Sequence, residues 1–284
     1  MARTKSVILV LLLLVSSLSG IAFSFDQKDT VEGLSPTQQE VLDELSSSIY
    51  VGGSFSTSPW DWVVGGGGQG LGIVADSNGN AYVTGYFSGT VSFGNTSLTS
   101  SGTADIFIAK LSSSGSWLWA VKAGGSDHDE GSGIAVDSSG DTYITGHFSS
   151  PSATFGNTSL SISGINSIFV AKISSTGSWQ WAKGAGSANS NNYDEGRGIS
   201  VSSNGEVAIT GCIAGDTSFG TYSLTHDGEQ DGFVATLDIN GTWLSAALIG
   251  GSSDAHGNTV ILDSQGNAYV SGFFAYKATF GNIN

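Results

Sequence analysis

Three short acidic segments of the chain carry side chains that could bind a metal ion. GGSDHDEGSG holds Asp127, Asp129 and Glu130, NSNNYDEGRG holds Asp194 and Glu195, and GGSSDAHGN holds Asp254. Carboxylate oxygens that converge on one point supply the hard oxygen ligands that calcium prefers. These residues are therefore candidate calcium ligands. The alternative is a set of solvated acidic loops on an acidic protein.

Residues typical of catalysis do not assemble into a recognisable motif. The four histidines, His128, His147, His226 and His256, fall in three different kinds of place in the sequence pattern. The chain has no Gly-x-Ser-x-Gly, His-Glu-x-x-His or phosphate-binding glycine motif. Cys212 has no basic neighbour and is expected to be a small packed residue rather than a nucleophile. We therefore expect no catalytic residues and no cofactor.

The beginning of the chain has the three-part layout of a secretory signal peptide over residues 1–24. Arg3 and Lys5 precede an apolar run over 7–15, and a segment of small and polar residues ends at Ser24. The run is shorter than the ~20 residues of a membrane-spanning helix, and no later segment is apolar enough to span a bilayer. We expect export to the cell surface or the extracellular space, with a retained N-terminal anchor as the alternative.

The expected mature chain is strongly acidic. Loss of residues 1–24 removes two basic residues and no acidic residue, which leaves 7 Lys and Arg against 24 Asp and Glu. Such a surface repels phosphate backbones, so nucleic acid is not an expected partner. Because Cys212 is the single cysteine, the chain cannot form an internal disulfide.

Residues 25–59 form an N-terminal segment for which one short helix is predicted over about 36–46. Ser35 is a suitable N-cap, Pro36 stands at the first helical position, and Gln38 follows three residues after Ser35. The apolar residues that follow give the helix a stripe that can dock on the next domain.

A segment of fourteen residues recurs four times and organises the rest of the chain. GIVADSNGNAYVTG, GIAVDSSGDTYITG, GISVSSNGEVAITG and TVILDSQGNAYVSG end at Gly85, Gly146, Gly211 and Gly272, with steps of 61, 65 and 61 residues. The same period separates Phe93, Phe155, Phe219 and Phe280, and also the segments of the IFIAK and GSWLWA types. A shared period indicates a tandem array of one supersecondary unit.

Each unit contains four short strands. In the second unit these are 133–137, 142–146, 168–172 and 178–183, separated by Gly, Ser, Asn and Asp. A four-stranded meander cannot cover both its faces alone, so it stacks on its neighbours around a centre. The sequence therefore predicts an all-β fold, a β-propeller with four-stranded antiparallel blades of 61–65 residues. A β-helix, with shorter rungs and no hairpins, is the alternative.

The blades are expected at about 72–122, 133–183 and 198–247, with a lone fourth strand at 60–64 and a partial blade at 259–284. Residues 60–284 thus hold about 3.5 blades. Because a closed ring needs more units, we expect the chain to be a fragment of a larger protein.

Two sets of repeated residues have expected structural roles. In the turn between the first two strands, aspartates accept backbone hydrogen bonds and glycines adopt a positive φ. These turn residues are Asp76, Gly79, Asp137, Gly140, Gly205, Asp263 and Gly266. The tryptophans of the fourth strands are expected to pack between blades; they are Trp117, Trp119, Trp179, Trp181 and Trp243.

The repeated segments resemble a known family. GIAVDSSGDTYITGHF, SIFVAKISSTGSWQWA and the AGG that follows Trp119 are similar to the seven-bladed β-propeller (SBBP) repeat, over about residues 60–284. The first two strands of each unit also resemble NHL repeats. The resemblance implies a secreted or surface repeat protein of bacterial or archaeal type. It does not imply a particular activity.

The long and variable connections all fall at one edge of the predicted blades. They join the second strand to the third, and the fourth strand to the next blade. Length variation on a fixed scaffold marks a candidate binding face. We expect a non-enzymatic, exported propeller that presents this face to a protein or polysaccharide. A purely structural spacer is one alternative, and an exported hydrolase or lyase with an axial metal is the other.

Overall fold

The computed structural model describes residues 8–11, 48–53, 62–161, 164–187, 193–275 and 278–280. Their regular structure consists of β-strands, so the all-β prediction is confirmed. The helix expected at 36–46 lies outside the described residues, as does most of the leader expected at 1–24. None of the described residues belongs to a helix with the length and apolarity that a membrane crossing requires.

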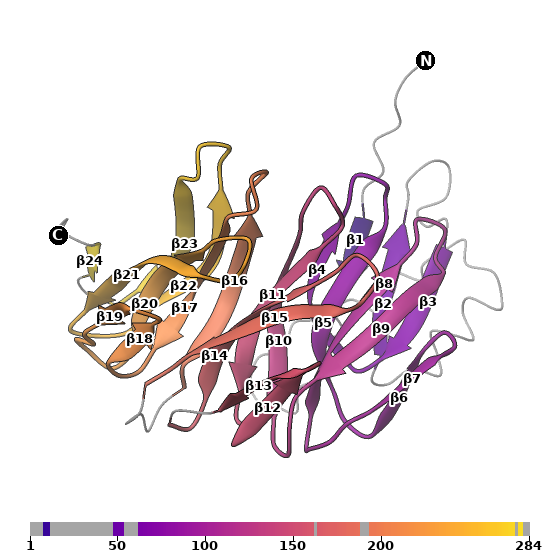
Figure 1. Ribbon diagram of the computed structural model, residues 1–284, viewed down its shortest axis with the longest axis horizontal. Coiled ribbons are helices and arrows are strands. Elements are labelled where there is room, and N and C mark those ends of the chain that lie inside the picture. The colour runs from indigo at the N-terminus through magenta and orange to yellow at the C-terminus, as the bar shows by residue number, and fades with distance from the viewer. Residues whose placement is uncertain are drawn as a thin grey trace, which may run out of the picture.

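Three antiparallel sheets form the complete blades, each with the same four strands in order; the sheet of the third blade has one further strand at its edge (Figure 1). Blade 1 consists of β4 (Gln69–Ala75), β5 (Ala81–Phe87), β8 (Asp105–Leu111) and β9 (Trp117–Ala123). Blade 2 consists of β10 (Asp129–Val136), β11 (Thr142–Phe148), β14 (Ser167–Ile173) and β15 (Trp179–Ala185). Blade 3 consists of β16 (Glu195–Val201), β17 (Val207–Ile213), β20 (Asp231–Leu237) and β21 (Trp243–Gly251). The same strand order in each unit confirms the propeller blades predicted from the repeat.

Each loop between the second and third strands contains a small hairpin that reaches the preceding blade. The hairpins are β6 (Thr90–Phe93) with β7 (Thr96–Thr99), β12 (Ser152–Phe155) with β13 (Thr158–Ser161), and β18 (Thr217–Phe219) with β19 (Tyr222–Leu224). Thr154 of β12 bridges to Gly124 after blade 1, and Thr217 of β18 bridges to Ser187 after blade 2. Successive blades are therefore joined at their outer edge by backbone hydrogen bonds.

Two smaller sheets flank the complete blades. On one side β1 (Ile8–Leu11), β2 (Ser48–Gly53) and β3 (Trp62–Gly67) form a three-stranded sheet. The strand expected at 60–64 thus corresponds to β3, whose Val64 packs on the core of blade 1. On the other side β22 (Ala255–Leu262) pairs with β23 (Ala268–Phe274), and β24 (Ala278–Phe280) pairs with β21 of blade 3.

The blades stack face to face through apolar cores. Ile106 of blade 1 packs in one cluster with Phe169 of blade 2, and Val170 of blade 2 packs in another with Phe233 of blade 3. The first strands, β4, β10, β16 and β22, contact one another in turn and so lie nearest the centre. Figure 1 shows the sheets side by side in sequence order. Burial of both sheet faces explains why apolar residues cluster in the strands.

The tryptophans of the fourth strands occupy two kinds of position. Trp117, Trp179 and Trp243 pack edge-on against the phenylalanine that ends β6, β12 or β18, with ring centroids 5.1 to 5.4 Å apart. Trp119 and Trp181 reach the following blade, where their indole N–H groups donate to the carbonyls of Ser175 and Ile239. These bonds link the half-buried indoles of one blade to the backbone of the next.

The turns between the first two strands follow one hydrogen-bonding pattern. In blade 2, Asp137 Oδ1 accepts from the N–H groups of Ser139 and Asp141, and its Oδ2 accepts from the hydroxyl of Tyr143. Asp76 and Asp263 make the corresponding bonds in their units. The turn glycines, Gly79, Gly140, Gly205 and Gly266, have φ between 79° and 85°. This left-handed conformation favours glycine over any residue with a Cβ.

The glycine that ends each fourteen-residue repeat is required by a close backbone crossing. A Cβ on Gly146 would lie 1.9 Å from the carbonyl oxygen of Glu130, and a Cβ on Gly85 would lie 1.8 Å from that of Gln69. The crossing lies beside a β-bulge in the first strand, between Gly131 and Gly133 in blade 2. The repeated glycine is therefore an architectural residue.

Two buried threonines on β11 allow a matched test of hydroxyl energetics. Thr145 Oγ1 donates to the carbonyl of Phe169 at 2.8 Å, whereas Thr142 Oγ1 has no hydrogen-bond partner among the described residues. We expect Thr145→Val to cost about 1–2 kcal/mol of unfolding free energy. Thr142→Val should be neutral or stabilising by up to about 1 kcal/mol, because it removes an unpaired buried hydroxyl. Urea unfolding measures both; equal destabilisation would contradict this difference.

Candidate functional site

Each unit has a β-bulge near the beginning of its first strand. The extra residue is Leu71 in β4, Ser132 in β10, Arg197 in β16 and Asn258 in β22. A bulge leaves this residue out of the ladder and re-aims its side chain. The bulged residues and their neighbours lie at the edge that carries the long loops. We call them the loop-side rim: Gln69, Leu71, Tyr86, His128, Glu130, Ser132, His147, Glu195, Arg197, Cys212, His256, Asn258 and Phe273.

Where blades 1 and 2 meet, the loop-side rim brings two histidines and a glutamate together. His128 Nε2 lies 3.5 Å from Glu130 Oε2, and the His128 ring stacks on that of His147 with centroids 5.9 Å apart. Tyr86 of blade 1 packs edge-on against His128. One ligand atom from each of His128, Glu130 and His147 lies within 4.8 Å of the other two. This is a compact set of two imidazoles and one carboxylate.

Burial and neighbouring charges shift the pKa values of these three groups in different directions. The hydrogen bond to Glu130 raises the pKa of His128 above its ordinary value. Burial lowers the pKa of His147. Burial alone would raise the pKa of Glu130, but the bond to His128 and the charges of both histidines outweigh it and lower that pKa. At neutral pH the cluster therefore combines a carboxylate with a neutral His147 ring.

Where blade 3 meets β22, the loop-side rim holds an arginine in a polar network. Arg197 Nε donates to Glu195 at 2.9 Å, and its Nη1 lies 2.7 Å from His256 Nδ1 and 3.2 Å from Asn258 Oδ1. His256 Nε2 lies 2.8 Å from Gln230 Oε1. Burial and the charge of Arg197 lower the pKa of His256. A neutral His256 accepts from Arg197 on one ring nitrogen and donates to Gln230 from the other.

Two of the predicted calcium ligands bind the protein's own loops. The buried Asp129 carboxylate accepts from the N–H groups of Gly125, Ser149 and Ser150 and from the Ser150 hydroxyl. In the next unit Asp194 accepts from the N–H groups of Ser187 and Ala214 and from the Ser187 hydroxyl. Each carboxylate ties the crossing between two blades to the loop after the second strand. Burial raises the pKa of both.

The other candidate ligands lie apart. Asp127 is exposed and accepts from the N–H of His128, Asp254 is half-buried in the crossing before β22, and Glu195 is paired with Arg197. Among the described residues, the group of three ionisable side chains close enough to share one ion is His128, Glu130 and His147. Of the six candidate carboxylates, Asp129 and Asp194 thus face loop N–H groups, and calcium binding stays a prediction.

Cys212 occupies in blade 3 the position that His147 occupies in blade 2, since Glu195 and Glu130 are their cross-strand partners. Its side chain is buried, and burial raises its pKa to about 12. A thiol with such a pKa stays protonated at neutral pH and is a poor nucleophile.

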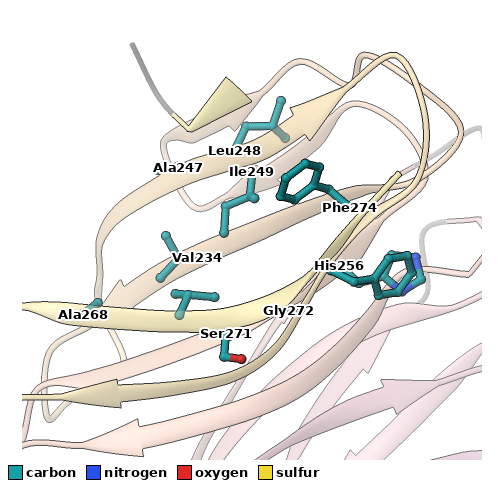
Figure 2. Close-up of a pocket in the computed structure, with 11 residues that line it drawn as sticks. Val234, Ala247, Leu248, Ile249, His256, Ala268, Ser271, Gly272 and Phe274 are labelled. Carbon is teal, nitrogen blue, oxygen red and sulfur yellow. The ribbon is translucent and has the colours of Figure 1, made fainter. Parts of the chain in front are cut away.

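A cavity of about 680 Å³ lies between blade 3 and β23 (Figure 2). Its walls are mostly apolar and include Val234, Leu248, Ile249, Val270 and Phe274. In blades 2 and 3 the second strand pairs with a third strand, whereas β23 pairs with β22 alone among the described residues. The cavity therefore has the character of an incompletely filled core between blades. It offers few polar groups to orient a ligand.

Comparison with known proteins identifies the repeat. A family model described as a β-propeller repeat, SBBP, matches residues 119–147. Residues 119–147 are therefore similar to an SBBP β-propeller repeat. This confirms the resemblance inferred from the repeated segments. The matched residues run from Trp119, near the beginning of β9, through the β10–β11 hairpin. They include the bulge at Ser132 and the whole His128, Glu130 and His147 cluster.

A curated relative points to the same class of repeat protein. An uncharacterized WD repeat-containing protein, L264, of Acanthamoeba polyphaga mimivirus is 26% identical over 187 residues, or 57% of this chain. The match covers 13% of the relative's own length. Together with the SBBP match, this similarity supports a repeat protein of the propeller type.

The repeat determines where the residues of the loop-side rim lie in each unit, but not which side chains stand there. The sequence pattern alone does not predict that the His128 and His147 rings are in contact, because the two histidines fall in different parts of the repeat. The turn at the middle of the repeat does contain this information. It makes the first and second strands antiparallel, so that residues at the two ends of the repeat are cross-strand neighbours, as Glu130 and His147 are. The bulge at Ser132 shifts the register by one residue and hides this pairing from simple counting.

Proposed function

We propose that this protein is an exported, non-catalytic β-propeller scaffold whose loop-side rim binds a protein or polysaccharide partner. One observation carries the proposal. The units share their strands, turns and closing glycines, yet equivalent positions of the rim hold different side chains. The first position of the rim is Gln69, Glu130, Glu195 or His256, and its cross-strand partner is Tyr86, His147, Cys212 or Phe273. The side chains of the rim therefore differ between units, although the backbone that carries them is the same.

The loop-side rim also has the composition of a recognition surface. Arg197 of β16 is oriented by Glu195 and by the next unit. Tyr193, in the crossing just before β16 and beside the rim, is 59% exposed. Arginine and tyrosine are enriched at the centres of interfaces because they combine apolar area with directional hydrogen bonds. With 24 acidic and 9 basic residues in the whole chain, a neutral polysaccharide or a basic protein surface is the favoured partner.

Export is part of the proposal and rests on the layout of residues 1–24. The leader has a basic start, an apolar run and a small-residue end. Appearance of the mature chain in the medium or on the cell surface, with residues 1–24 removed, is the expected result of fractionation and N-terminal sequencing. Retention of the chain in the cytosol would contradict this part.

Binding is tested with the mature chain on immobilised neutral polysaccharides (cellulose, chitin and dextran) and on a surface-protein extract of the source organism. We expect Arg197→Ala or Tyr193→Ala to weaken the interaction at least tenfold, the loss of about 1.4 kcal/mol. Gln265→Ala, in the exposed turn between β22 and β23 at the opposite edge, is the matched control and should leave binding unchanged. Equal binding by all three variants would place the partner away from Arg197 and Tyr193, and absence of binding by the parent chain would favour a purely structural spacer.

A further inference from the structure

Within the loop-side rim, the cluster of His128, Glu130 and His147 has a donor set that can bind a metal ion. The three side chains come from two adjacent segments, the crossing before β10 and the β10–β11 pair. Ligand atoms from the three lie within 4.8 Å of one another. In a tetrahedral zinc site with bonds of about 2.0–2.2 Å, ligand atoms lie about 3.4 Å apart. A modest closure of the side chains would therefore complete the triangle.

The backbone already holds the three residues in place. Glu130 and His147 are direct cross-strand partners, so their side chains lie on the same face of the sheet. His128 is fixed from two sides, since its carbonyl accepts from the Ser149 N–H at 2.9 Å and its backbone bridges to Ala104 of blade 1. Its side chain is 39% exposed and can turn toward the other two. Because the backbone of the three residues is already ordered, little conformational entropy is lost when an ion binds.

A second observation points to a ligand at this place. The Nδ1 atom of His147 is buried and has no hydrogen-bond partner among the described residues. Buried ring nitrogens in proteins are normally paired, and an unpaired one needs an explanation. Either ring nitrogen can face Glu130, because the two ring flips fill the same volume. With one nitrogen bound to a cation and the other protonated, the ring has the form in which histidine binds metals.

The equivalent positions of the other described units do not repeat this donor set. Blade 1 has Gln69 opposite Tyr86, and the fourth unit has His256 opposite Phe273. Blade 3 has Glu195 opposite Cys212, but there the Arg197 guanidinium already neutralises Glu195. Any metal site of this kind therefore belongs to blade 2.

We propose that blade 2 binds one divalent transition-metal ion, with zinc as the representative, through His128, Glu130 and His147. Two imidazoles and one carboxylate suit zinc and similar ions, whereas calcium prefers a shell of oxygens. Three protein ligands leave a further coordination position for water or for a group of the bound partner. The ion would join the crossing from blade 1 to the second strand of blade 2. The ion belongs to the loop-side rim, but its binding is measured without a partner, so failure of this proposal and failure of the proposed partner binding can be told apart.

The test is zinc titration of the full mature chain after dialysis against a chelator, followed by calorimetry and by elemental analysis of the gel-filtered protein. We expect one equivalent of zinc, retained in millimolar calcium. His147→Ala and Glu130→Gln should each weaken binding at least tenfold. His226→Asn, a histidine outside the cluster, is the control and should bind as tightly as the parent.

Substitution of cobalt for zinc gives a readout that does not depend on stability. The parent chain should show visible absorption of a cobalt–imidazole site, and Glu130→Gln, which preserves side-chain volume, should lose it while its circular dichroism stays unchanged. Zinc binding below one tenth of an equivalent in the parent would overturn the proposal. So would equal zinc affinity in the His147→Ala and His226→Asn variants, because the ion would then bind elsewhere.

Discussion

Gly146→Ala should destabilise the protein by about 3 kcal/mol or more, near the upper end of overpacking costs. The new Cβ would lie 1.9 Å from the carbonyl oxygen of Glu130 and 2.9 Å from the ring of Phe169. Backbone cannot yield as a flexible side chain does, so β10 and β11 must separate. Because Phe169 belongs to the core between blades 1 and 2, the disturbance spreads to the neighbouring blade.

Gly184→Ala is the matched control in the same blade. Its Cβ would meet nothing closer than 3.7 Å, and Gly184 lies in the exposed part of β15. Alanine should therefore be neutral or stabilise by up to about 1 kcal/mol, because it reduces the entropy of the unfolded chain. Thermal and urea unfolding of both variants measure the contrast. Gly146→Ala with parental stability would show that the crossing of β10 over β11 is not as close as described.

Asp129→Ala should have the second largest effect, a loss of about 3 kcal/mol. The carboxylate is fully buried and accepts four hydrogen bonds from Gly125, Ser149 and Ser150. Alanine would leave those donors unpaired in a space that water does not reach, which costs more than the net value of the bonds. Asp129→Asn should also destabilise, because its amide N–H₂ group would face N–H donors.

Asp127→Ala, two residues earlier, is the control for that change. Asp127 is exposed and accepts from the N–H of its neighbour His128, so its loss should change the stability by less than about 0.5 kcal/mol. Chemical denaturation gives the free energies, and amide exchange at Ser149 and Ser150 gives the local effect. If Asp127→Ala proved the more damaging, the assignment of Asp129 as the buried loop tie would be wrong.

The architecture could be predicted because the residues that determine it recur in every unit of the sequence. The closing glycines at Gly85, Gly146, Gly211 and Gly272, the turn aspartates and the Phe and Trp positions all share one period. Each is fixed by local geometry that recurs in every unit: a positive φ, a close crossing or a buried ring. Such residues report their structural role wherever they occur.

The chemistry of the loop-side rim was harder to predict, because it depends on contacts between units. Asp129 and Glu130 are adjacent carboxylates, yet the first faces loop N–H groups and the second faces His128 and His147. Side chains alternate along a strand, so neighbours in sequence lie on opposite sides. The bulge between Gly131 and Gly133 then interrupts that alternation where the two histidines meet.

The central claim is that the repeat builds stacked four-stranded blades and leaves chemical variation to the loop-side rim. Amide hydrogen exchange on the full chain tests it most directly. We expect the slowest exchange in the two middle strands of each blade, β5 and β8, β11 and β14, and β17 and β20, recurring at 61 to 65 residues, with faster exchange in β23. Protection that fails to recur at this interval, or that continues through the turns at Gly79, Gly140 and Gly205, would contradict it.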